Sequence, residues 1–303
     1  MNDGQHASLD PATRLGEVGL RVADLDRAIG FYSGGAGLEV LQRDEARAVL
    51  GSRGVATLQL THRPDLQAAP RGSAGLYHTA VLYQERSDLA AAVYAAASGT
   101  HGAFTGSADH LVSEAFYFDD PEGNGVELYW DRPRDQWRWV ADAVAMDTLP
   151  LDPNAFIATH FTGAGTPAAP MGAPTTIGHV HLKVGDIAVA RDFYVDKLGF
   201  DVTTAMGNSA LFTSAGGYHH HVGMNVWESR GAGPRTESLG LDHFTVVVPD
   251  AAALALTAER LGDAGWHFGR GIAADGAEML TMADPWGTEV RVTAERERAT
   301  VTA

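Results

Sequence analysis

Side chains that could bind a metal ion lie in short segments where polar and apolar residues alternate. In "HVHLKV", residues 179–184, the alternation places three apolar side chains on one face of a strand and His179, His181 and Lys183 on the other. The chain contains no cysteine, which excludes disulfides, thiolate nucleophiles and thiolate metal sites. Any metal ion must therefore be held by histidine, carboxylate, amide or tyrosine side chains.

Two Asp-Pro turns carry a second set of candidate residues. The segment "DDPEGNGVELYW", residues 119–130, has a near twin in "ADPWGTEVRVTA", residues 283–294. Glu127 in the first copy corresponds to Arg291 in the second. The twins predict two similar sites, of which only the first keeps a carboxylate that could bind a metal.

Longer repeats show which elements must position these residues. The segment "LGEVGLRVADLDRAIGFYSGGAGLEV" matches "IGHVHLKVGDIAVARDFYVDKLGFDV", and each copy predicts a strand, an amphipathic helix and a stop at glycine. Two further strands, "GLYHTAVLY" and "GLDHFTVVV", each lead into a helix and then into strands around an Asp-Pro turn. The repeats predict four βαβββ modules, at roughly residues 13–63, 74–132, 175–229 and 238–294.

A βαβββ module covers one face of its sheet with its own helix and must line or bury something with the other face. The predicted fold class is therefore α+β, with four modules forming two cup-shaped sheets. We expect a first pair of modules within residues 1–132, a helix-like segment and linker at 133–174, and a second pair within 175–303. The middle segment begins helix-like around Trp137 and Trp139 and ends rich in Pro, Gly and Ala.

The composition excludes several classes of partner. The 303 residues include 22 Lys and Arg against 38 Asp and Glu, a formal net charge of −16. This charge repels phosphate backbones and anionic lipid surfaces, so neither nucleic acid nor a membrane is expected as a partner. The sequence shows no secretory signal and no apolar stretch of membrane-spanning length, so we expect a cytoplasmic protein, with a homo-oligomer left open.

The modules, the "D-[LI]-x-x-A-x-x-FY" helix and the "DP-x-G-[NT]" turn together resemble the vicinal oxygen chelate superfamily. This superfamily includes glyoxalase I, fosfomycin and bleomycin resistance proteins, and type I extradiol dioxygenases. The resemblance covers residues 13–294, and "DHLVSEAFYFDDPEGNGVELYW" and "GGYHHHVGMNVW" look most like two-domain catechol 2,3-dioxygenase-type proteins. It implies that metal ligands come from the first strand of one module and from the first and last strands of its partner.

Two pairings of the modules are compatible with the resemblance, and they select different ligands. If the modules pair in sequence, one cup holds Glu17, Gln59, His78 and Glu127, a set similar to that of glyoxalase I. If they pair crosswise, two with three and one with four, one cup holds His78, Glu127 and His179. Two histidines and one carboxylate are the usual ligands of non-haem Fe(II) oxygenases.

Under crosswise pairing, the remaining cup keeps Glu17, Gln59, His243 and Arg291. This set does not make a plausible metal site. We expect Arg291 to pair with Glu17 there, because a buried charge is costly to leave unpaired.

The crosswise pairing implies a metal-dependent extradiol dioxygenase that opens a catechol- or hydroquinone-type aromatic ring with O2. Fe(II) is the expected cofactor, with Mn(II) or another divalent metal as alternatives. The resemblance assigns Tyr117 to the position near the substrate hydroxyl, His220 or His221 to proton transfer, and His110 to a nearby supporting position. Tyr117 and Glu127 are expected to face each other across a hairpin.

Two other functions are compatible with the same modules. A glyoxalase-like isomerase or lyase would bind Zn2+, Ni2+ or Mn2+ through the in-sequence ligand set. A metal-free small-molecule binding protein would instead present an aromatic-lined cup. The clustered histidines and glutamates favour a metal site over the metal-free alternative.

Overall fold

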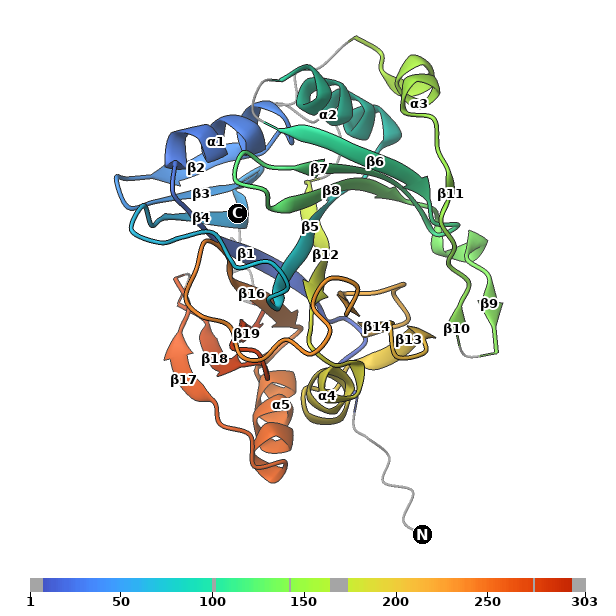
Figure 1. Ribbon diagram of the computed structural model, residues 1–303. Helices are drawn as coiled ribbons and strands as arrows, with labels where there is room; N and C mark the ends of the chain where they lie inside the picture. The colour runs from blue at the N-terminus through green and yellow to red at the C-terminus, as the bar shows by residue number, and fades with distance from the viewer. Residues whose placement is uncertain (1–7, 100–101, 142, 164–173, 275, 296–303) are drawn as a thin grey trace, which may run out of the picture.

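The computed structural model describes residues 8–99, 102–141, 143–163, 174–274 and 276–295 (Figure 1). Within this part of the chain, four βαβββ modules form as predicted, and a middle segment separates the second module from the third. None of the helices in these ranges is long and apolar enough to cross a membrane.

The first two modules precede the middle segment. Module one consists of β1 (Arg14–Val22), α1 (Leu25–Gly34), β2 (Glu39–Arg43), β3 (Arg47–Ser52) and β4 (Val55–His62). Module two consists of β5 (Gly75–Tyr83), α2 (Arg86–Ser98), β6 (Ala103–Asp109), β7 (Ser113–Asp119) and β8 (Gly125–Asp131).

The last two modules repeat this order. Module three consists of β12 (Thr176–Lys183), α4 (Ile187–Arg191) with the π-helical turn η2 (Asp192–Lys197), β13 (Asp201–Met206), β14 (Ala210–Ser214) and β15 (Val222–Asn225). Module four consists of β16 (Gly240–Val248), α5 (Ala251–Asp263), β17 (Gly269–Ile272), β18 (Glu278–Ala283) and β19 (Glu289–Ala294). Helices α1, α4 and α5 begin after an aspartate whose side chain accepts backbone N–H groups of the first turn.

The modules pair crosswise. The sheet of modules one and four, here the 1/4 sheet, has the strand order β17-β18-β19-β16-β1-β4-β3-β2. The sheet of modules two and three, here the 2/3 sheet, has the order β11-β6-β7-β8-β5-β12-β15-β14-β13, in which β11 (Leu149–Pro150) comes from the middle segment. The first strands of paired modules run antiparallel side by side, β1 with β16 and β5 with β12. The in-sequence pairing is therefore wrong, and each sheet takes one module from each half of the chain.

The repeated Phe-Tyr and Asp-Pro motifs connect the two sheets. The Tyr32 hydroxyl of α1 donates to Asp120 Oδ2 in the turn between β7 and β8, at 3.0 Å. The Tyr194 hydroxyl of module three donates to Asp284 Oδ2 in the matching turn of module four, at 2.9 Å. All four residues are buried, so each motif pair forms one internal hydrogen bond between modules that belong to different sheets.

The middle segment differs from the helix-like start that its sequence suggested. It contains a short 3-10 turn η1 (Arg134–Gln136), three two-residue strands and a later helix, namely β9 (Trp139–Val140), β10 (Ala143–Val144), β11 (Leu149–Pro150) and α3 (Pro153–His160). Trp137 is buried against Tyr218 of module three, so tertiary packing overrides the local helix preference. The Pro/Gly/Ala-rich stretch expected to be a linker lies largely at residues 164–173, outside the described residues.

One continuous apolar core joins the helices to both sheets. In β12, Val180 and Leu182 are buried in this core, as the alternation predicts. Figure 1 shows α1 and α2 together at one end of the molecule and α4 and α5 at the opposite end. The helices therefore cover the apolar face of each sheet, and the polar residues of β5, β8 and β12 lie on the opposite face of the 2/3 sheet.

Candidate metal centre

Three neighbouring strands of the 2/3 sheet carry the predicted metal ligands. Strands β8, β5 and β12 lie next to one another, and the register pairs Ala80 of β5 with both Glu127 of β8 and His179 of β12. His78 lies two residues before Ala80 and therefore on the same face of β5. Because Ala80 is small, the three longer side chains can meet above it.

The structure brings His78, Glu127 and His179 together in the protein interior. Glu127 Oε2 lies 2.9 Å from His78 Nε2 and 3.1 Å from His179 Nε2. Among the described residues, His78 Nε2 is buried without an aligned hydrogen-bond partner, although the carboxylate is close. A buried nitrogen without a partner is costly, and a metal ion at this position would satisfy it. Two imidazoles and a carboxylate thus fit a divalent metal in both chemistry and position.

The electrostatic environment favours the forms of these side chains that bind metal. Burial lowers the pKa of His179 to about 4, so its imidazole is neutral near pH 7. Burial alone would raise the pKa of Glu127, but the adjacent His179 and His78 hold it well below its usual range. A neutral imidazole beside an ionised carboxylate can donate lone pairs to a cation.

The ring of His179 is positioned by packing on both sides. Its centroid lies 4.1 Å from that of His220 and 4.9 Å from that of Tyr129. His179 Nδ1 is buried without a hydrogen-bond partner among the described residues, which differs from the usual metal-bound histidine, whose second nitrogen donates to a carboxylate or carbonyl. The orientation of this ring therefore depends on its neighbours.

Tyr117 and His110 form a hydrogen-bonded pair beside the three candidate ligands. Tyr117 lies opposite Glu127 in the register of β7 and β8, as predicted. His110 Nε2 lies 2.7 Å from the Tyr117 hydroxyl, and His110 Nδ1 lies 2.8 Å from the carbonyl oxygen of Asp147. Burial, with the nearby Glu127 carboxylate, raises the pKa of Tyr117 well above its usual value, so this hydroxyl keeps its proton.

The three consecutive histidines before β15 have different surroundings. His220 lines the cavity of the 2/3 sheet, and burial lowers its pKa, so that its imidazole is neutral. Its Nδ1 lies 2.8 Å from His219 Nδ1, while His219 Nε2 lies 2.9 Å from Asp131 Oδ1. His221 packs against Tyr218, accepts the backbone N–H of residue 215 and is absent from the cavity lining. His220 is therefore in place to meet a ligand, whereas His221 has a packing position.

A cavity of about 820 Å³ opens over these residues. Its lining comes from modules two and three and from the middle segment, which supplies Met146, Asp147 and Thr148. The candidate site residues that line it are His78, His110, Tyr117, Glu127 and His220. A small organic molecule in this cavity would therefore contact two of the three candidate ligands, His78 and Glu127. It would also contact the hydrogen-bonded pair of Tyr117 and His110.

His181 also lines the cavity, although its sequence pattern predicted no role beyond facing the cup. Its ring centroid lies 5.0 Å from that of His78, and its Nε2 lies 3.0 Å from Asn225 Nδ2. Burial lowers its pKa well below the usual value. The strict alternation of "HVH" was the signal for this residue, since it places His179 and His181 on one face.

The sequence model of the Glyoxalase/Bleomycin resistance protein/Dioxygenase superfamily matches residues 14–128 and 176–292. The chain belongs to this superfamily. A catechol-2,3-dioxygenase from Bacillus subtilis (strain 168) is 39% identical over 266 residues, which cover 86% of this chain and 92% of that protein. Membership of the superfamily, predicted from the motifs, is thus confirmed.

Solved structures of low sequence identity share the fold of this superfamily member. A proposed dioxygenase from Bacillus subtilis has a TM-score of 0.63 at 13% identity, with 96% of this chain and 86% of that chain covered. Glyoxalase I from Zea mays has a TM-score of 0.55 at 17% identity, with 93% and 92% covered. The predicted arrangement of modules in cup-shaped sheets is therefore confirmed at the level of the fold.

The second cup of this superfamily member lies in the 1/4 sheet and holds the remaining predicted residues. Glu17 Oε1 lies 3.6 Å from His243 Nε2, and Gln59 Nε2 donates to Thr61 Oγ1 at 3.4 Å. The glyoxalase-like set of four ligands is not formed, because Glu17 and Gln59 belong to a different sheet from His78. The alternative ligand set of the in-sequence pairing is therefore ruled out together with that pairing.

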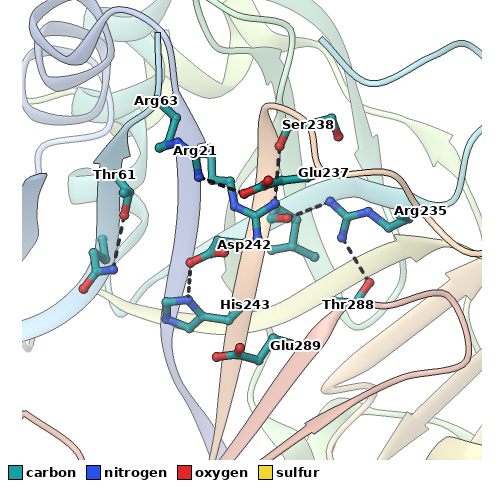
Figure 2. Close-up of polar contacts among 12 residues, drawn as sticks. Arg21, Thr61, Arg63, Arg235, Glu237, Ser238, Asp242, His243, Thr288 and Glu289 are labelled. Carbon is teal, nitrogen blue, oxygen red and sulfur yellow. Dashed lines mark hydrogen bonds and ion pairs between the residues drawn. The ribbon is translucent and has the colours of Figure 1, made fainter. Parts of the chain in front are cut away.

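Arg291 provides a cation inside this second cup. Its Nε donates to Glu289 Oε1 at 2.7 Å, and its Nη1 lies 2.9 Å from His243 Nε2. Figure 2 shows Asp242 beside the same histidine, where Asp242 Oδ2 lies 3.1 Å from His243 Nδ1. The expected pair with Glu17 is replaced by one with Glu289, which lies two residues earlier on the same strand face.

Proposed function

We propose that this protein is a metal-dependent extradiol dioxygenase that opens the ring of a catechol- or hydroquinone-type aromatic with O2. The observation that carries the proposal is the buried cluster of His78, Glu127 and His179, with a histidine nitrogen left without an aligned partner. The relative named catechol-2,3-dioxygenase, which matches most of the chain, supports the same reaction class.

The three clustered residues would hold the metal. We propose Fe(II), since two histidines and one carboxylate are its usual set in non-haem oxygenases, and Mn(II) has similar ligand preferences. When bound, such an ion supplies a Lewis acid that lowers the pKa of the diol hydroxyls, and a redox centre for O2.

Tyr117 and His110 would orient the substrate. The Tyr117 hydroxyl keeps its proton and lies 2.7 Å from His110 Nε2, so it can donate to that nitrogen while its oxygen accepts a hydrogen bond from a substrate hydroxyl in the cavity. The contact of His110 with the carbonyl of Asp147 fixes which of its nitrogens carries the proton. We therefore assign both residues to substrate positioning.

His220 is the residue that we assign to proton transfer. It lines the cavity, it is neutral, and it is linked through His219 to the carboxylate of Asp131. A neutral histidine at the end of such a chain can accept a proton at the cavity and share the developing charge. His221 has no access to the cavity and is not assigned this role.

The test is ring opening by protein purified without oxygen, loaded with Fe(II) and then mixed with a simple catechol in aerated buffer. We expect a yellow ring-opened product and oxygen consumption in a one-to-one ratio, both lost in Glu127→Ala. Glu17→Ala, which changes a carboxylate in the other cup, is the control and should keep the activity. Iron-loaded protein that binds a catechol but consumes no oxygen would overturn the proposal in favour of an isomerase, a lyase or a binding protein.

A further inference from the structure

The cavity is larger than a single-ring diol requires. Its volume of about 820 Å³ lies in the range of pockets that bury drug-sized ligands. The candidate ligands His78 and Glu127 line one part of it, and the remaining lining extends to Met206, Phe212 and Trp227 of module three. A diol held at His78 and Glu127 would therefore leave much of the cavity to another part of the same molecule.

An aromatic wall faces this remaining space. The Tyr77 ring centroid lies 5.5 Å from that of Trp227 and 5.1 Å from that of His181, and Phe212 adds a further ring 5.6 Å from His181. Trp227 is 52% exposed and Met206 is 46% exposed although both line the cavity. Large apolar side chains left open in a pocket indicate a ligand that covers them.

The charges around the cavity disfavour an anionic substituent. Among the described lining residues, Lys183 is the one lysine or arginine, and its Nζ lies 3.7 Å from Glu228 Oε2. Asp119 and Asp147 add two more carboxylates to the lining. A carboxylate on the substrate would therefore meet three acidic groups besides Glu127, and one cation that already has a partner.

The charge of the whole chain acts in the same direction. The formal net charge of −16 creates a field that repels small anions and attracts cations, while it leaves neutral molecules largely unaffected. This field is screened by salt over roughly 10 Å at 0.1 M ionic strength. Discrimination against an anionic substrate should therefore weaken as salt is added.

We propose that the substrate is a catechol-type diol with a bulky, uncharged aromatic or apolar substituent that lies against Trp227, and that diols carrying a carboxylate are disfavoured. This inference rests on the proposed function of the site. It assigns Trp227 and the Lys183–Glu228 pair to substrate selection.

The first experiment compares three diols: catechol, 3-phenylcatechol and 3,4-dihydroxyphenylacetate. We expect the phenyl compound to exceed catechol in kcat/KM by about tenfold or more, and the anionic compound to fall below catechol by a similar factor. Equal values for the three diols, or a preference for the anionic one, would overturn the inference. Dissociation constants measured by calorimetry without oxygen should follow the same order, so a correct binding order with no ring opening would refute only the proposed function.

Two variants test the roles of Trp227 and of the Lys183–Glu228 pair. For each variant the measured quantity is the ratio of the kcat/KM values for two diols, compared with the same ratio in the parent protein. Trp227→Ala should lower the preference for 3-phenylcatechol over catechol by about tenfold in this ratio. Glu228→Gln should release Lys183 and make 3,4-dihydroxyphenylacetate a better substrate relative to catechol, by about three- to tenfold at low salt.

The matched control removes an acid from an ion pair outside the cavity. Glu278→Gln breaks the exposed contact between Glu278 and Arg270 in the 1/4 sheet, 2.8 Å long, and should leave both selectivity ratios unchanged. If Trp227→Ala leaves its ratio unchanged, the substituent does not lie against Trp227. If Glu228→Gln acts no differently from Glu278→Gln, the Lys183–Glu228 pair does not select against anions.

Discussion

The two cups of the molecule start from the same backbone pattern and reach different chemistry. In the 2/3 sheet, His78 and Glu127 meet with an imidazole nitrogen left without an aligned partner. In the 1/4 sheet, the position matching Glu127 is Arg291, whose guanidinium lies 2.9 Å from His243. A cation supplied by the chain contacts the histidine of one cup, whereas the residues of the other cup could hold a cation from solution.

The neighbouring positions of the two strands reinforce this difference. His243 lies against Gly19, where an added Cβ atom would fall 2.2 Å from the imidazole ring. The repeat places His181 at the position of Gly19 in the 2/3 sheet, where it lines an open cavity. In the 1/4 cup His243 therefore packs into the space beside Gly19, and Arg291 of β19 contacts it.

The largest expected effect comes from giving the 2/3 cup the residue of the 1/4 cup. Glu127→Arg should abolish both metal retention and ring opening, because the guanidinium would occupy the position of the metal and repel it. Metal content per chain and oxygen consumption measure the result, and Glu127→Gln serves as the smaller change of the same side chain. Retained metal in folded Glu127→Arg would contradict the comparison of the two cups.

The next largest effect is a difference in turnover between variants of two adjacent histidines, His220 and His221. His220→Phe should leave metal binding nearly intact and lower turnover by about 100- to 10,000-fold, the range for loss of one general acid or base. His221→Phe should change turnover far less, because His221 packs away from the cavity against Tyr218. Steady-state kinetics on both variants, with iron content measured in parallel, decides the matter. Equal losses in the two variants would remove His220 from its assigned role.

The buried histidines of the 2/3 sheet should make stability depend on pH. Burial lowers the pKa of His221 from 6.5 to about 3 and that of His179 from 6.5 to about 4. The unfolded chain binds protons on these groups as the pH falls below 6.5, whereas the folded chain does not. The contribution of these two histidines to the free energy of unfolding is therefore fully present above about pH 6.5. It decreases toward pH 4, by about 1.4 kcal/mol per pH unit for each histidine.

Urea unfolding of the metal-free protein between about pH 4.5 and 7 measures this slope. His221→Gln should reduce the slope by the share of one histidine. A slope that is identical in the variant and the parent would show that His221 is protonated in the folded state.

The two tyrosine–aspartate hydrogen bonds that connect the sheets should contribute equally to the free energy of unfolding, whereas the two cups should differ in metal binding. Tyr32→Phe and Tyr194→Phe each remove a buried hydrogen bond to an aspartate and should lower the free energy of unfolding by about 1 to 3 kcal/mol. Urea denaturation of both variants gives the two values. A loss at only one tyrosine would mean that the repeated motifs do not have the same structural role.

The smallest effect is expected at Glu17. Its side chain is 24% exposed and lies 3.6 Å from His243 Nε2, while Arg291 pairs with Glu289. Glu17→Ala should therefore cost about 1 kcal/mol or less, in the range of partly exposed ion pairs. A loss above about 3 kcal/mol would show that Glu17 is the main partner of a buried charge.

Much of this arrangement could be predicted from local patterns. Strand alternation, helix stops at glycine and internal repeats indicated four modules, and the contrast of Glu127 with Arg291 indicated that the two cups differ. The choice between the two pairings could not be made from local patterns, because it depends on β5 lying beside β12, a contact between segments about 100 residues apart.

Other features depend on tertiary contacts in the same way. The middle segment forms small strands because Trp137 is buried against module three, which its own sequence does not reveal. The link of Tyr32 to Asp120 joins motifs that were visible separately, but their partnership follows from the packing of α1 against the β7–β8 turn. The position of Arg291 beside Glu289 depends on side-chain reach along one strand face.

The most direct test of the central claim is the number of metal ions per chain. Protein purified without oxygen and incubated with Fe(II) should retain one ion per chain after desalting, and His179→Ala should retain none while Glu17→Ala still retains one. Two ions in the parent protein, or full retention by His179→Ala, would contradict the assignment of one metal-binding cup and one cup occupied by Arg291.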